Sequence, residues 1–293
     1  MSEFKLIGFL TEKQVGSFFI FSYLISWLGF LPSLLGYEGI ISQITLFIAQ
    51  FGPALAAVFI IQLTDKSFKE WIKQIIHWHV PIRWWIATLT VPILIFGTTS
   101  VFFAMFVYQL KISMLINSLL SYFPTLLFST LLAGLGEEPS WRGYALPRLQ
   151  KKYGPFRATL LLGFIWALWH IPVFFIDPRS SHSITNPWLI AWMIFLTAIG
   201  IILYSFFYTW IYNKTQSILL MMILHGGFNT STTYLVPFDN EIVFGPSYIT
   251  LLTVQITIIF LGTIIILFIT GGKLGYKPDI KTNHKNHKNI GKK

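Results

Sequence analysis

The sequence predicts an all-α protein: a polytopic transmembrane helix bundle of about eight spans, with both termini in the cytoplasm. The chain is 54% hydrophobic and only 11% charged, with a mean hydropathy of +0.66, whereas soluble domains carry about 25% charged residues. Apolar stretches of roughly 20 residues, the length that crosses ~30 Å of hydrocarbon, occur repeatedly. They lie near residues 15–36, 39–63, 84–108, 115–137, 157–176, 188–212, 216–236 and 247–270.

The basic residues predict the orientation of the bundle. When successive loops are assigned to opposite sides of the membrane, nineteen of the 21 Lys and Arg residues fall on one side. Only Lys111 and Arg179 fall on the other side. Cytoplasmic loops carry the excess of Lys and Arg, so the basic side is cytoplasmic. Orientation and attraction to anionic lipid head groups then account for the net charge of +10, and no nucleic-acid partner is expected.

The chain divides into four predicted parts. Residues 1–120 hold the N-terminal spans, with an amphipathic helix lying on the cytoplasmic face near 65–81. Residues 121–236 carry the polar groups considered below, and 237–270 form the last span. Residues 271–293 are expected to be a basic cytoplasmic tail without fixed structure. The chain has no cysteine, which excludes disulfides and thiolate chemistry.

Five ionisable side chains lie far from the ends of the apolar stretches: Glu137, Glu138, Arg142, His170 and His225. A charged group at membrane depth costs at least ~2.5–3.5 kcal/mol, so these side chains are candidates for a functional site. Adjacent carboxylates on a helix point about 100° apart, and therefore Glu137 and Glu138 cannot share one role. Glu138 and Arg142, spaced i and i+4, are expected to form an ion pair. The alternative is that both glutamates only cap a helix end.

The candidate residues are predicted to share one depth in the membrane. At about 1.5 Å per residue, Glu137 lies about 21 Å from Lys151, His170 about 20 Å from Arg157, and His225 about 17 Å from Lys214. Asn229 lies one turn beyond His225, on the same helix face. Together they supply a base for activating water and donors for an oxyanion, which favours hydrolysis by direct attack of water. Ser140 has no base nearby in sequence and is expected only to line the site.

Three ordered motifs connect these residues with a known family. They are Glu137-Glu138-x-x-x-Arg142, Trp166-x-x-x-His170 and His225-x-x-x-Asn229, each on its own predicted span. The set resembles the CAAX protease and bacteriocin-processing family of intramembrane endopeptidases, also called the abortive-infection family. The second motif of that family usually carries Phe where this chain has Trp166, a departure expected to alter the shape of the pocket rather than its chemistry.

The resemblance implies a glutamic intramembrane endopeptidase that needs no cofactor, with its catalytic core in residues 121–236. Glu137 would be the general base, and His170 would hold or activate the water. His225 and Asn229 would stabilise the oxyanion, while the second acid and the arginine of the first motif would orient the site. The substrate would be a peptide or protein in the membrane, such as a CAAX-type terminus, a bacteriocin or a self-immunity peptide, in a prokaryotic cell membrane.

Three alternatives remain open from the sequence. Glu137, Glu138, His170 and His225 are residue types that bind Zn²⁺, although the chain lacks an H-E-x-x-H motif, so metal-independent catalysis is preferred. The protein could instead act by binding, as a non-catalytic immunity or regulatory partner in the membrane. A proton-coupled transporter also uses intramembrane acids and histidines, but the internal repeats expected of one are absent from the sequence.

Overall fold

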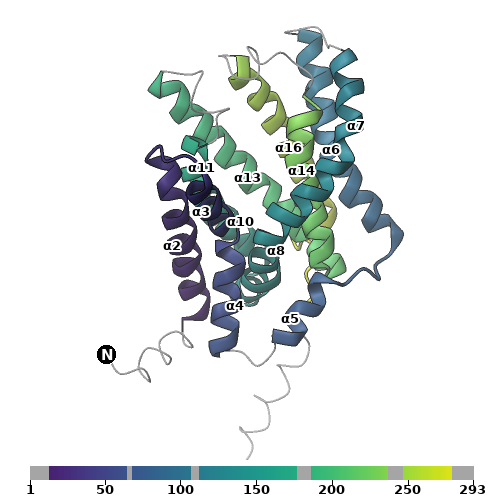
Figure 1. Ribbon diagram of the computed structural model, residues 1–293. Helices are drawn as coiled ribbons and strands as arrows, with labels where there is room; N and C mark the ends of the chain where they lie inside the picture. Colours follow the sequence, from purple (N-terminus) through teal and green to yellow (C-terminus); the bar gives the residue numbers. More distant parts are fainter. Residues whose placement is uncertain (1–12, 65–67, 107–111, 177–185, 237–246, 279–293) are drawn as a thin grey trace, which may run out of the picture.

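The computed structural model describes residues 13–64, 68–106, 112–176, 186–236 and 247–278. All regular elements within these ranges are helices, which confirms the predicted all-α polytopic bundle (Figure 1). Six helices are long and apolar enough to span a membrane, and a bent pair makes a seventh. The bent pair consists of α3 (Ile40–Gln50) and α4 (Gly52–Thr64), which meet at 53°.

The predicted windows correspond to these helices in order. The window near 216–236 is α14 (Ile218–Tyr234), whose 17 residues are at the lower limit for crossing the hydrocarbon core. The window near 157–176 contains two helices, α10 and the short α11, because the α-helix is interrupted at His170, whose N–H bonds to the carbonyl of Ala167. The other spans are α2 (Gln14–Leu34), α6 (Ile82–Phe106), α7 (Ile112–Ser129) with its continuation, α10 (Pro155–Trp169) with α11 (Ile171–Ile176), α13 (Pro187–Thr215) and α16 (Ser247–Thr270).

The start of the first described helix and the residues after the last helix lie at one end of the bundle. Phe18 of α2 packs against Tyr144, with ring centroids 5.1 Å apart. Gln150 of α9 (Leu146–Tyr153) exchanges hydrogen bonds with Asn213 near the end of α13, and Asn213 also donates to the carbonyl of Leu274. The basic stretch of α9 therefore shares this end with both ends of the described chain, as the predicted orientation requires.

The amphipathic helix predicted near 65–81 is shorter than expected. It is α5 (Phe68–Ile75), at the lower end of the bundle in Figure 1, and residues 77–81 continue without helical structure. Pro81 disfavours the helical region only for Val80, the residue before it, so it does not explain the end of α5 at Ile75. Trp71 turns inward from α5, and its indole N–H donates to the carbonyl of Pro139 over 2.8 Å. Residues 65–67 lie outside the described residues.

Residues 271–278 also differ from the prediction, because they fold back on the bundle instead of continuing as an unstructured tail. Leu274 is fully buried, although its φ of 48° is unusual for a residue with a side chain. Gly271, Gly272 and Gly275 adopt positive φ as well, which glycine does at little steric cost. The hydrogen bond from Asn213 and the burial of Leu274 stabilise this turn. The rest of the predicted tail, 279–293, lies outside the described residues.

The span that carries both glutamates does not end at residue 137 but continues helically to Tyr153. Two π-helical stretches interrupt it, and such stretches are frequent at functional sites. After α7 the chain forms η1 (Thr130–Gly134), α8 (Leu135–Ser140), η2 (Trp141–Ala145) and then α9.

Glycines allow the other helices to approach this span closely. A Cβ atom on Gly134 would lie 2.6 Å from the carbonyl oxygen of Met222 in α14, and one on Gly136 would lie 2.6 Å from that of Gln50. From α14, a Cβ on Gly226 would lie 2.8 Å from the backbone nitrogen of Thr130. The α8 segment thus packs between α4 and α14, backbone against backbone (Figure 1).

Candidate active site

Glu137 is almost fully buried, at 2% exposure, and each of its carboxylate oxygens accepts a hydrogen bond from a different span. Gln50 Nε2, at the end of α3, donates to Oε1 over 2.8 Å. The indole Nε1–H of Trp166, in α10, donates to Oε2 over 2.6 Å. Hydrogen bonds to a carboxylate are stronger than those between neutral groups, so these two donors hold Glu137 in a defined position without a full positive charge.

Glu138 has different partners from its neighbour. Its Oε1 accepts from Arg142 Nη1 over 3.0 Å, which is the ion pair expected from the i, i+4 spacing. The same oxygen lies 2.7 Å from Nδ1 of His225. A carboxylate can only accept, so in this arrangement Nδ1 carries the ring proton. The two adjacent acids therefore face separate partners, as the helix geometry predicted.

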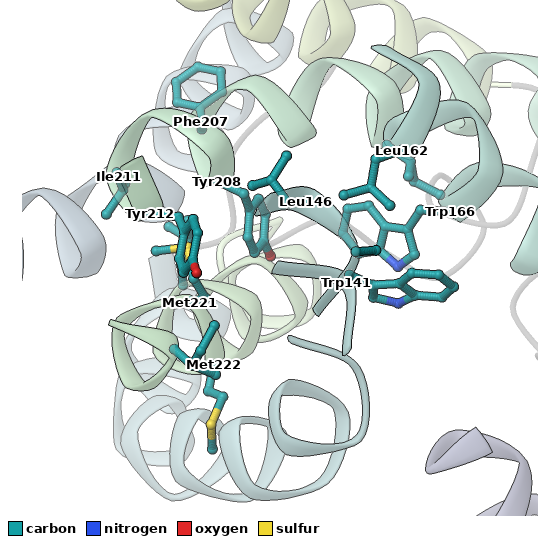
Figure 2. Packing of buried hydrophobic residues seen from close by; sticks show 14 of the residues in the cluster. Trp141, Leu146, Leu162, Trp166, Phe207, Tyr208, Ile211, Tyr212, Met221 and Met222 are labelled. Atoms are coloured by element: carbon teal, nitrogen blue, oxygen red, sulfur yellow. The ribbon is translucent and has the colours of Figure 1, made fainter. Parts of the chain in front are cut away.

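Arg142 lies inside the protein with no exposed surface. It is one of the nineteen basic residues that the sequence assigns to the cytoplasmic side. Its guanidinium carbon is 4.1 Å from the ring centroids of both Trp166 and Tyr208. Trp166 belongs to α10 and Tyr208 to α13, and Figure 2 shows both rings in the core, with Trp141 beneath Trp166. Cation–π contacts on both rings and the bond to Glu138 together make the buried charge tolerable.

The two histidines occupy different positions relative to the acids. His225 Nε2 lies 3.9 Å from Oε1 of Glu137, so this ring connects the two glutamates. His170 stands at the end of α10, where its Nδ1 is 2.9 Å from the carbonyl oxygen of Trp166. Its ring meets that of Trp166 edge to face, with centroids 5.5 Å apart. The structure thus brings both acids, both histidines and Trp166 into one cluster.

The side chains of two further residues considered in the sequence make no hydrogen bond to the side chains of this cluster within the described ranges. Asn229 is exposed on α14, and its side chain makes no hydrogen bond with the part of the protein that the structure describes. Ser140 is completely buried, and its hydroxyl donates to the backbone carbonyl of Glu137 over 2.6 Å. The hydroxyl of Ser140 is therefore satisfied within its own helix, and its role as a lining residue stays a prediction.

Sequence comparison agrees with the motifs. Residues 119–231 match the model of the family described as "Type II CAAX prenyl endopeptidase Rce1-like". Over 107 residues the chain is 38% identical to CAAX prenyl protease 2 of Methanococcus maripaludis, covering 35% of this chain and 38% of that protein. Residues 119–231 are thus similar to the CAAX prenyl endopeptidase family, a family of peptidases. The apolar helices make the chain a multi-pass membrane protein, and the matched segment spans less than half of it.

The buried polar cluster includes contacts from two residues that the sequence did not reveal, Gln50 and Tyr208. Gln50 lies within an apolar window and carries no ionisable group, so the charged residues did not indicate it. Its amide inside a predicted membrane span was the feature that could have marked it as part of the site. Tyr208 gave no such signal, because it is one of several aromatic residues in its helix. Trp166 was expected to affect only the shape of the pocket, but it is a hydrogen-bond donor to Glu137, which phenylalanine cannot be.

The geometry of the polar cluster bears on the zinc-binding alternative. Among the described residues, no group of three or more His, Asp or Glu side chains is arranged to hold a metal ion. Both oxygens of Glu137 accept from N–H donors, and Glu138 already faces the guanidinium of Arg142, which would repel a second cation. The four residues named as possible zinc ligands therefore do not fit that role in this arrangement.

Arg142→Gln tests the balance of charge in the cluster. Removing the guanidinium leaves Glu138 as a buried acid with only His225 beside it, which is expected to cost ~3–5 kcal/mol of stability. Thermal unfolding of the purified protein in detergent should show a marked fall in the midpoint. The double variant Glu138→Gln/Arg142→Gln should recover part of the loss, because no unpaired charge remains. Arg157→Gln, at an exposed position, is the matched control; equal midpoints for the two arginine variants would contradict this account.

Proposed function

We propose that this protein is an intramembrane endopeptidase in which Glu137 activates water to hydrolyse a peptide bond. The observation that supports it most directly is the division of labour between the two acids. Glu138 takes the guanidinium, whereas Glu137 is held by the neutral donors of Gln50 and Trp166. A base needs a fixed position without a counter-ion bound to the lone pairs that receive the proton. Glu137 meets this requirement better than Glu138.

The proposed reaction needs no covalent intermediate with the enzyme. Glu137 removes a proton from water as the water oxygen attacks the carbonyl carbon of the substrate, while His170 orients that water. The tetrahedral intermediate carries a negative oxygen. When the C–N bond breaks, Glu137 returns the proton to the leaving nitrogen, and the products are a carboxylic acid and an amine.

The oxyanion would be stabilised from α14. His225 donates Nδ1–H to Glu138, which fixes the ring and directs Nε2 to the side of Glu137. In its doubly protonated form the ring can donate from Nε2 to the oxyanion, and two neighbouring carboxylates favour a positive charge there. Asn229, one turn further along α14, is the proposed second donor.

The substrate is proposed from the family and from the depth of the site. The relative in Methanococcus maripaludis is a CAAX prenyl protease by name, and a buried site among membrane spans fits a peptide that is anchored in the bilayer. We therefore favour the terminal part of a membrane-associated peptide or small protein, in a prokaryotic membrane. Processing of a bacteriocin or a self-immunity peptide uses the same chemistry.

Glu137→Gln is expected to abolish cleavage, because the amide keeps the shape of the side chain but cannot accept the proton. A general base contributes about 10²- to 10⁴-fold, so hydrolysis of an internally quenched farnesylated CAAX peptide by the purified protein should fall by at least that range. Glu70→Gln changes an exposed acid in the same way and should leave the rate intact.

Membrane peptidomes extend this test to natural substrates. Cells with Glu137→Gln should accumulate uncleaved peptides that cells with the unaltered protein or Glu70→Gln process. If the Glu137→Gln protein hydrolyses peptide at the normal rate, the proposed base is wrong. If instead it is inactive but still restores the phenotype of a deletion strain, the biological role rests on binding, as for an immunity or regulatory partner.

Trp166→Phe isolates the indole N–H. Phenylalanine keeps an aromatic face on Arg142 but loses the hydrogen bond to Glu137, and a hydrogen bond to a charged group contributes ~1.5–3 kcal/mol. We expect kcat to fall about 10- to 100-fold with little change in KM. Trp27→Phe removes an indole bond to the backbone carbonyl of Trp169 and is the control. A change in KM alone would assign Trp166 to substrate binding instead.

Chelation tests whether a metal takes part. With glutamate as the base, exhaustive dialysis against a chelator should leave the rate of peptide hydrolysis unchanged, with less than one equivalent of zinc per chain by elemental analysis. Complete loss of activity that added Zn²⁺ restores would overturn metal-independent catalysis. It would also require a rearrangement of Glu137 and Glu138 from the positions described here.

A further inference from the structure

A basic pocket lies at the cytoplasmic end of the bundle, far along the helices from the glutamates. It occupies about 680 Å³ between the start of α6, the end of α13 and the turn after α16. Four cations line it: Arg83, Lys214, Lys273 and Lys277. No acidic residue lines it, and none of the four cations has an acidic partner within the described ranges of the chain. The pocket therefore presents concentrated positive charge to its contents.

One wall of the pocket is aromatic and apolar. The rings of Trp84 and Trp210 meet edge to face with centroids 5.2 Å apart, and Trp84 is largely buried beneath the rim. Ala87, one turn along α6, and Ile269, near the end of α16, continue this wall in the direction of the membrane interior. Trp is typical of the level at which lipid head groups lie. The pocket thus joins a charged rim to an apolar surface.

The turn after α16 positions part of the cationic rim. The buried Leu274 and the bond from Asn213 anchor the turn, with Lys273 on one side of the anchor and Lys277 three residues beyond it. The Lys214 side chain runs along Gly275, where an added Cβ would lie 2.7 Å from its Cε. With the positive φ values of Leu274 and Gly275, the turn places Lys273 and Lys277 in the lining of the same cavity as Lys214 of α13.

We propose that this pocket binds the phosphate head group of an anionic membrane lipid, with an acyl chain against Ala87 and Ile269. The cations attract the phosphate, and basic residues near the membrane surface each add to such attraction. The apolar wall favours a lipid over a free phosphate ion, which would gain nothing from it. Lipid binding at this pocket is separate from the hydrolysis proposed for Glu137 and can be measured in the inactive Glu137→Gln protein.

Native mass spectrometry of the full chain in detergent can test this proposal with phosphatidylglycerol as the probe and phosphatidylcholine for comparison. The variant Arg83→Gln/Lys273→Gln/Lys277→Gln should weaken binding of phosphatidylglycerol by about tenfold or more. The matched control, Lys69→Gln/Lys151→Gln/Lys152→Gln, removes the same charge from exposed cytoplasmic positions outside the pocket. It should change the affinity by less than about threefold.

A variant that keeps every charge separates the pocket from general attraction. Gly275→Val places a Cβ against Lys214 and strains the turn at a φ of 71°, so it should displace the lysines and weaken phosphatidylglycerol binding, while the protein still elutes as a single species on size exclusion. Equal losses in the two triple variants, or unchanged binding in Gly275→Val, would mean that diffuse surface charge accounts for phosphatidylglycerol binding. Either result would contradict the proposed lipid site. Competition by millimolar inorganic phosphate that matches competition by the lipid would assign the pocket to a soluble phosphate instead.

Discussion

Two adjacent carboxylates inside a membrane protein impose the constraint on which the rest of the structure depends. Both are buried away from bulk solvent, so each finds hydrogen-bond donors in the protein itself. Because neighbouring residues on a helix point in different directions, one helix cannot satisfy both acids. The donors come from four places: Gln50 on α3, Trp166 on α10, His225 on α14, and Arg142 on the same span as the acids. The packing of these helices is thus linked to the chemistry of the acids.

Close helix packing makes this arrangement possible. The glycines at 134 and 136 let α14 and the end of α3 contact the backbone of the acid-bearing span directly. The two π-helical stretches surround α8, which carries the glutamates, so the acids sit on one short turn between two irregular segments. Tight packing holds that turn in place, since each neighbour supplies both van der Waals contact and a hydrogen bond.

The sequence predicted the class of fold and most of the polar cluster, because both depend on strong and local signals. Long apolar stretches and isolated charges stand out in any membrane span, and the i, i+4 pair of Glu138 and Arg142 follows from helix geometry alone. Contacts between spans were harder to predict. Gln50 and Tyr208 belong to the cluster only because of how distant helices pack, and no pattern in their own helices indicates that. The turn at 271–278 was missed because its order depends on Asn213, in another helix.

The long sequence separation of these partners has a consequence for how the protein is made. Gln50 precedes Glu137 by 87 residues, and His225 follows Glu138 by 87 residues. At a synthesis rate of about 5–20 residues per second, His225 emerges roughly 4–17 s after Glu138. Until then Arg142 is the cation near enough in sequence to neutralise that acid while the span enters the membrane. The ion pair needs only one turn of its own helix, whereas the contact with His225 requires α14 to have been made.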